Sequence, residues 1–112
     1  MSDITKQSLT ELVENIKDKK LSSTEVTKAF IDRSEKSKEL NAYITEDFTS
    51  ALDKAKKFDQ KPNLDLKLPG IPMAVKDLFC TKDIKTTAGS KILNNFVPTY
   101  ESTVTENIWS EG

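Results

Sequence analysis

A chain of 112 residues has room for one small domain or for part of a larger one. Its 17 basic and 18 acidic side chains leave a net charge of −1, which argues against direct nucleic-acid binding by this segment, and no apolar run approaches the ~20 residues that a membrane-spanning helix needs. The chain has one cysteine and no histidine, which excludes an internal disulfide, serine–histidine and cysteine–histidine catalytic pairs and histidine-ligated zinc, and leaves carboxylates, lysine and tyrosine for proton transfer.

The first predicted element is a helix over residues 8–19. Ser8 and Glu11 form the Ser-x-x-Glu pattern of a capping box, in which the two side chains satisfy backbone N–H groups at a helix start. Apolar residues follow at helical spacing: Leu9, Leu12, Val13 and Ile16. Lysines near residue 19 complement the partial negative charge of the last carbonyls, so the helix is expected to end there.

A second helix is predicted to begin at once, because Ser22 and Glu25 repeat the capping box. Leu21 and Val26 occupy the two positions of a hydrophobic staple, which fixes the angle at which the chain enters the helix. The later part of this helix is rich in charge, which predicts a solvated surface: Asp32, Glu35, Lys36, Lys38 and Glu39.

Residues 41–45 break the helical period and are rich in strand-forming side chains, so they predict a short strand. A third amphipathic helix follows, with Asp47 as a candidate N-cap and an apolar face made by Phe48, Ala51, Leu52, Ala55 and Phe58. Residues 59–67 are polar and contain a proline, which predicts an exposed connection. The region 1–60 is therefore expected to be helical.

The sequence changes from polar to mainly apolar after residue 67. Leu68, Pro69 and Gly70 predict a turn, and the nearly unbroken apolar run over 71–80 predicts a buried strand. A lysine and an aspartate interrupt this run, and the period of two puts them on opposite faces: Lys76 with Ala74 and Leu78, Asp77 with Val75 and Phe79. The two charged side chains are thus not expected to pair with each other.

Lys76 has two interpretations. If the strand ends just before it, the stem of the side chain covers apolar surface and the ammonium reaches water, which is the commoner arrangement of a lysine. If the strand encloses it, Lys76 is a candidate general base. A lysine works as a base near neutral pH only when its pKa falls from about 10.4 to about 7, which costs roughly 4 to 5 kcal/mol and needs an enclosed apolar environment.

Four stretches occur in the order and at the spacing of a known family. They are Gly-Ile-Pro at 70–72, Val-Lys-Asp at 75–77, Thr-Thr-Ala-Gly-Ser at 86–90, and Tyr-Glu-Ser-Thr-Val at 100–104, the last at the start of a helix. Together with the preceding helices and the Asn-Ala-Tyr-Ile segment at 41–44, these stretches resemble the amidase signature family. The resemblance covers most of the 112 residues.

This resemblance implies an α/β fold in which amino-terminal helices are followed by the first strands of a mixed sheet covered by helices. Residues 1–112 would be the amino-terminal part of one amidase domain, with 68–112 as a strand-loop-helix region that carries the catalytic lysine. The resemblance also implies a serine–lysine mechanism, in which Lys76 is the general base that acts through a bridging serine on a nucleophilic serine. Both serines of the family lie downstream of this chain, so the 112 residues alone are expected to be inactive.

Within the family, the segment 91–100 resembles the glutamine-hydrolysing subunits of tRNA-dependent amidotransferases. This likeness implies release of ammonia from glutamine to convert Glu-tRNA(Gln) to Gln-tRNA(Gln) in translation. The implied partners are a tRNA-binding, B-type subunit, which uses ATP and Mg²⁺, and a small, C-type subunit; no cofactor or metal is expected in this chain. A cytoplasmic or organellar-matrix location is expected. Two alternatives stay open: a stand-alone serine–lysine amidase of another small amide, and a truncated, non-catalytic remnant or interaction module.

Three further residues are candidates for chemistry. Ser90 has no histidine partner and is expected to hydrogen-bond locally in a loop. Asp77 could orient Lys76 or bond backbone N–H groups, and their opposite faces favour a structural role. Cys80 could be a reactive thiol, but a lone cysteine beside an aromatic residue is more often a small buried hydrophobe.

Overall fold

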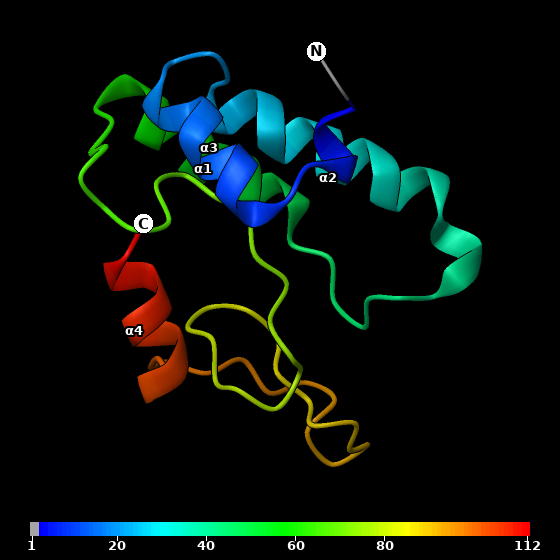
Figure 1. Cartoon of the computed structure of the whole chain (residues 1–112). Helices are drawn as coiled ribbons and strands as arrows, with labels where there is room; N and C mark the ends of the chain where they lie inside the picture. The colour runs from blue at the N-terminus through cyan, green and yellow to red at the C-terminus, as the bar shows by residue number, and fades with distance from the viewer. Residues whose placement is uncertain (1–2) are drawn as a thin grey trace. The chain divides into compact units, whose positions relative to one another are not determined.

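The computed structural model describes residues 3–112 and divides them into two compact units. Unit 1 consists of residues 3–42, 48–72 and 111–112, and unit 2 of residues 43–47 and 73–110. The described residues form the helical elements drawn in Figure 1: η1 (Ile4–Lys6), α1 (Leu9–Lys17), α2 (Ser23–Lys36), η2 (Lys38–Leu40), α3 (Phe48–Gln60) and α4 (Thr103–Ser110). All of them except α4 belong to unit 1.

Both capping boxes predicted from the sequence are present. Ser8 Oγ accepts the backbone N–H of Glu11 at 3.2 Å, while the Glu11 carboxylate accepts the backbone N–H of Ser8 at 2.7 Å. Ser22 and Glu25 make the same reciprocal pair at the start of α2, at 3.1 and 2.8 Å. The N–H that each serine donates holds the pKa of its glutamate below the ordinary value. The two predicted helix starts are confirmed.

The apolar core of unit 1 is built mainly on α1 and α2. Its buried side chains are Leu12, Ile16, Leu21 and Val26. The relative exposures of Leu21 and Val26 are 7% and 0%, which confirms the predicted staple at the start of α2. Phe30 of α2 and Phe58 of α3 pack against this core, so α3 lies beside α2 in Figure 1. The charge-rich end of α2 is exposed, as predicted.

The start of α2 is also capped from α3, through Asp59. The Asp59 carboxylate accepts hydrogen bonds from the backbone N–H groups of Ser23 and Thr24, at 2.9 and 2.8 Å. Those N–H groups have no acceptor inside the helix, so the carboxylate satisfies them and ties α3 to α2. In contrast to the exposed connection predicted over 59–67, Asp59 lies in the last turn of α3, which continues to Gln60.

Residues 68–71 form the predicted turn. The N–H of Ile71 donates to the carbonyl of Leu68 at 3.3 Å, and Gly70 has a φ of +65°, a conformation that residues with a side chain rarely adopt. Gly70 also lies against α2, because its carbonyl accepts a hydrogen bond from Ser23 Oγ at 2.6 Å. A Cβ at this position would lie 2.6 Å from Ser23 Cβ. Both the backbone conformation and the close contact therefore require glycine here.

The strands predicted over 41–45 and 71–80 are not formed. Residues 3–112 contain no strand, so the predicted mixed sheet is not confirmed. A strand needs a neighbouring strand for its N–H and C=O groups, and the apolar run over 71–80 has none within this part of the chain. Near its end the run turns instead, because the N–H of Phe79 donates to the carbonyl of Lys76 at 3.1 Å. Residues 41–45 begin with Asn41 in a left-handed conformation, with φ +50°.

Unit 2 is built from turns, loops and α4, the red helix in Figure 1. Its buried residues are mostly threonines: Thr81, Thr86, Thr87, Pro98 and Thr105. Many of its large apolar side chains are exposed instead, including Met73, Leu78, Ile92, Val97 and Val104. Polar threonine side chains, which hydrogen-bond within unit 2, thus take most of its buried positions.

Candidate functional site

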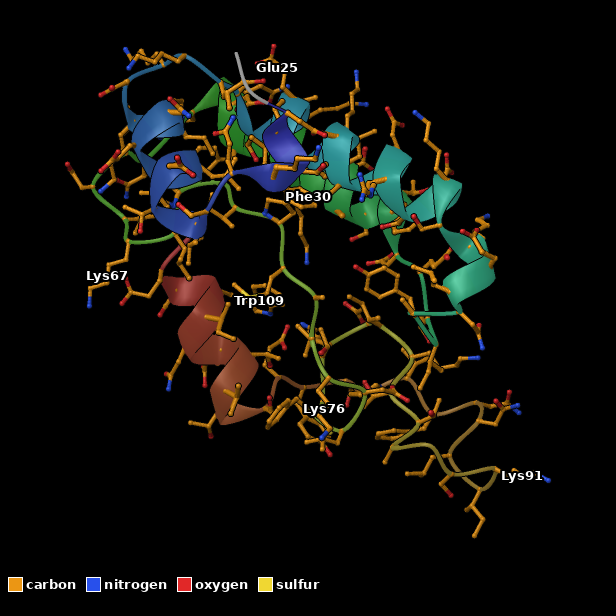
Figure 2. All side chains as sticks on the ribbon, turned by 45° about the vertical axis from the view of Figure 1, so that its right-hand side comes forward. Glu25, Phe30, Lys67, Lys76, Lys91 and Trp109 are labelled. Carbon is orange, nitrogen blue, oxygen red and sulfur yellow. The ribbon has the colours of Figure 1, made fainter. Side chains whose placement is uncertain are left out.

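Lys76, the predicted general base, lies in unit 2 at the start of a turn. Its carbonyl accepts the backbone N–H groups of Leu78 and Phe79, at 2.8 and 3.1 Å. Its side chain, labelled in Figure 2, is exposed and makes no hydrogen bond or ion pair within residues 3–112. The described residues thus leave the amine in solvent and do not enclose it.

Exposure alternates along the backbone around Lys76. Ala74 and Leu78 are exposed like the lysine, whereas Asp77 and Phe79 are half-buried. The lysine and the aspartate therefore point to different sides, as the period of two predicted, although no strand is formed within residues 3–112. They make no ion pair with each other.

Asp77 connects the lysine motif to the Thr-Thr-Ala-Gly-Ser stretch at 86–90. Its carboxylate accepts the Thr87 N–H at 2.8 Å and also the Thr87 hydroxyl, and its carbonyl accepts the Ala88 N–H at 2.7 Å. The hydrogen bond from the Thr87 hydroxyl is the main cause that lowers the pKa of Asp77 below its ordinary value. Of the two roles considered for Asp77, the bonding of backbone N–H groups is confirmed.

The stretch 86–90 bends tightly. Ala88 and Gly89 both have left-handed backbone conformations, with φ of +49° and +68°. Ser90 Oγ accepts the backbone N–H of Ile92 at 3.2 Å. The local hydrogen bonding predicted for Ser90 is thus confirmed.

Cys80 is half-buried, and its sulfur lies 3.6 Å from the hydroxyl of Tyr100. Their hydrogen bond raises the pKa of the Tyr100 phenol above its ordinary value, because the contact favours the neutral form. Cys80 is therefore less buried than the small core hydrophobe predicted from the sequence. The sequence motifs include Tyr100 in the Tyr-Glu-Ser-Thr-Val stretch but do not predict its contact with Cys80, since the two residues are 20 positions apart and only the fold brings them together.

Polar contacts also fix the start of α4. Ser102 Oγ accepts the backbone N–H of Thr105 at 3.2 Å, which confirms a helix start at the Tyr-Glu-Ser-Thr-Val stretch. The hydroxyl of Thr105 is fully buried and lies 3.0 Å from the Cys80 carbonyl and 2.6 Å from the Glu101 carboxylate. Sequence reasoning missed Thr105, although a serine three residues before it is a recognisable cap signal.

Residues 3–112 include no group of three or more Cys, Asp or Glu side chains placed to hold a metal ion. No helix of this part is long and apolar enough to cross a membrane. What the site offers chemically is the amine of Lys76 on a backbone anchored through Asp77. A lysine amine acts as a base near neutral pH only in an enclosed site, and residues 3–112 do not enclose this one.

Curated relatives from several organisms are similar to the whole chain. The A-type subunit of glutamyl-tRNA(Gln) amidotransferase from Pelagibacter ubique (strain HTCC1062) is 80% identical over 112 residues. The proteins of the same name from Rickettsia bellii (strain OSU 85-389) and Hyphomonas neptunium (strain ATCC 15444) are 47% and 45% identical over 114 residues. Each comparison covers 100% of this chain and 23% of the relative, so the chain spans about a quarter of the length of these relatives.

A protein-family model described as Amidase matches residues 25–112. The match covers most of the chain and contains Lys76, Asp77 and the Thr-Thr-Ala-Gly-Ser stretch. The match in this region agrees with the resemblance drawn from the sequence motifs. The chain belongs to the amidase family.

Proposed function

We propose that this chain is part of the glutamine-hydrolysing subunit of a Glu-tRNA(Gln) amidotransferase, which releases ammonia from glutamine to convert Glu-tRNA(Gln) to Gln-tRNA(Gln). The observation that carries the proposal is the 80% identity to the Pelagibacter ubique protein over all 112 residues. The relatives from Rickettsia bellii and Hyphomonas neptunium have the same name, which supports the same assignment. Because the chain covers 23% of each relative, the proposed activity is that of the complete gene product.

Lys76 is the residue to which we assign the proton transfers. It lies inside the region that matches the family, its backbone is anchored through Asp77, and its amine has no competing partner within residues 3–112. A base must lose its own proton before it can take another, and a lysine does so near neutral pH only in an enclosed site. In the proposed enzyme, segments outside these 112 residues provide the enclosure.

The proposed reaction follows from the needs of amide hydrolysis. The attacking hydroxyl must lose a proton, and the departing nitrogen must gain one. Lys76 Nζ takes the proton of a nucleophilic serine through a bridging serine, and the proton then passes to the nitrogen so that ammonia leaves. Water afterwards releases glutamate from the acyl-enzyme. We assign both serines to segments beyond this chain, on the resemblance to the amidase signature family.

The tRNA chemistry is assigned to partners. We propose a tRNA-binding, B-type subunit, which activates the glutamate with ATP and Mg²⁺, and a small, C-type subunit. The carboxylates of residues 3–112 do not form a cluster that fits a metal ion, so no step that needs Mg²⁺ is assigned to this chain. Because the substrate is an aminoacylated tRNA, the proposed activity belongs in a bacterial cytoplasm or an organellar matrix.

The proposal is tested by co-expressing the complete gene product with a candidate tRNA-binding subunit and a candidate small subunit. We expect the three to co-purify and to form Gln-tRNA(Gln) from Glu-tRNA(Gln), ATP and glutamine. With the Lys76→Ala variant, glutamine should no longer serve as nitrogen donor, whereas added ammonium chloride should still support the reaction. A gene product that purifies without partners and hydrolyses other small amides, but not glutamine, would overturn the proposal in favour of a stand-alone amidase.

A further inference from the structure

The backbone on both sides of the Lys76–Asp77 peptide is held by hydrogen bonds within unit 2. The Lys76 carbonyl accepts two backbone N–H groups from the turn that follows it. The Asp77 carbonyl accepts the N–H of Ala88, and the Asp77 carboxylate accepts the N–H and the hydroxyl of Thr87. By contrast, the side chain of Lys76 has no partner among the described residues. The backbone at Lys76 is therefore held in place, while its amine makes no contact of this kind within residues 3–112.

We infer that Asp77 and Thr87 are positioning residues for Lys76. They hold the backbone at Lys76 in place, so that the amine at the end of its side chain reaches the proton that it transfers. The inference rests on the proposed function, because it assumes that Lys76 is the base. It goes beyond that function by giving a task to two residues that make no hydrogen bond or ion pair with the amine. The amine of a lysine is four methylene groups away from its Cα, so a small rotation of the backbone moves the amine by a larger distance.

The size of the expected effect follows from the geometry of proton transfer. A misplacement of about 1 Å in a catalytic group can cost about 100-fold in rate. The hydrogen bonds of Asp77 resist such a movement, because they tie residue 77 to the separate stretch at 86–90 at two points, the carboxylate and the carbonyl. The carboxylate is held by both the N–H and the hydroxyl of Thr87, so loss of the hydroxyl weakens this point without removing it. Such a loosening is expected to lower the rate of the chemical step while substrate binding changes little.

Thr87 is the member of this pair that can be altered most cleanly. Its side chain is buried, with 5% relative exposure, and its hydroxyl both donates to Asp77 and accepts the Gly89 N–H at 3.2 Å. Thr87→Val keeps the shape and the backbone N–H but removes the hydroxyl. Thr87→Ser keeps the hydroxyl and removes only a methyl group. The two variants therefore separate the hydrogen bonds from the packing.

A purely structural role of Thr87 would also lower activity, through loss of folded protein, so a matched control is needed. Ser22→Ala removes the side-chain cap of α2 in unit 1, where Ser22 Oγ accepts the Glu25 N–H at 3.1 Å. Ser22→Ala thus removes a side-chain hydrogen bond that supports the fold, as Thr87→Val does in unit 2, and both losses are measured as a shift of the unfolding midpoint. Ser22 belongs to neither the lysine motif nor the stretch at 86–90.

The test measures kcat and KM for ammonia release from glutamine, together with the unfolding midpoint, in the complete gene product with its partner subunits. We expect Thr87→Val to lower kcat by about 10- to 100-fold with KM changed by less than about threefold. Thr87→Ser should restore kcat to within about threefold of wild type. Ser22→Ala should lower the unfolding midpoint and leave kcat close to wild type.

Other results distinguish failure of the positioning role from failure of the proposed function. If Thr87→Val and Ser22→Ala lower the unfolding midpoint equally and both keep a wild-type kcat, the positioning role is overturned while the proposed function stands. The same holds if Thr87→Ser fails to restore kcat, because the packing of the methyl group would then matter more than the hydroxyl. If the wild-type protein releases no ammonia from glutamine, the proposed function itself fails.

Discussion

The carboxylate of Asp59 accepts the backbone N–H of Ser23 at 2.9 Å, although 36 residues separate the two in sequence. This hydrogen bond, with its companion at Thr24, joins the last turn of α3 to the first turn of α2. The Ser22 side chain satisfies the next backbone N–H of the same helix start. The amino end of α2 is thus capped both by Ser22, which directly precedes the helix, and by Asp59 of α3.

Replacement of Asp59 by alanine is predicted to destabilise the protein by about 1 to 3 kcal/mol, because two buried or half-buried N–H groups lose their acceptor. The measurement is urea unfolding of wild type and Asp59→Ala. Asp53→Ala is the matched control, since Asp53 is an exposed carboxylate on the same helix. Equal unfolding midpoints for the two variants would show that the contact between α3 and α2 contributes no stability.

Alanine at Gly70 is predicted to cost more stability than alanine at Gly89. Both glycines have positive φ, +65° and +68°, so both variants carry a backbone strain of about 1 to 2 kcal/mol. At Gly70 the added Cβ would also lie 2.6 Å from Ser23 Cβ and 2.8 Å from Phe58 Cδ1, whereas at Gly89 it meets nothing within 4 Å. Overpacking of this kind adds roughly 1 to 3 kcal/mol. Unfolding curves that show the same loss for both variants would contradict the close contact.

The hydrogen bonds of Asp77 make part of the stability dependent on pH. Because they lower its pKa below the ordinary value of 3.8, they contribute stability that is present above pH 3.8 and is lost as the pH falls through the lowered pKa. Thr87→Val should therefore be less stable than wild type at neutral pH, and the difference should shrink in acid. The unfolding midpoints of both proteins across this pH range provide the check, and a difference that stays constant would count against the assignment.

The helices of unit 1 could be predicted from the sequence because their signals are local. A capping box such as Ser22 and Glu25 spans four residues, and both partners belong to the helix start that they define. The staple formed by Leu21 and Val26 is equally local. For the same reason, the turn over 68–71 could be predicted from Leu68, Pro69 and Gly70.

Contacts between distant residues could not be predicted in this way. The run over 71–80 has the composition of a buried strand, but strand formation depends on neighbours that are not among residues 3–112. The hydrogen bonds of Asp59 with α2, and of Cys80 with Tyr100, join residues whose proximity only the fold establishes. In the candidate site, the sequence indicated Lys76 and a structural role for Asp77 but gave no sign of Thr87 as its partner.

We propose Lys76 as the general base of an amide-hydrolysing enzyme. The decisive measurement is the rate of ammonia release from glutamine by the complete gene product with its partner subunits, in wild type, Lys76→Ala and Lys91→Ala. Lys91 is the control, because it is an exposed lysine of the same unit that lies away from Lys76, at the tip of a loop in Figure 2. We predict that Lys76→Ala lowers kcat by about 10²- to 10⁴-fold and that Lys91→Ala stays close to wild type. Unchanged turnover in Lys76→Ala would contradict the claim.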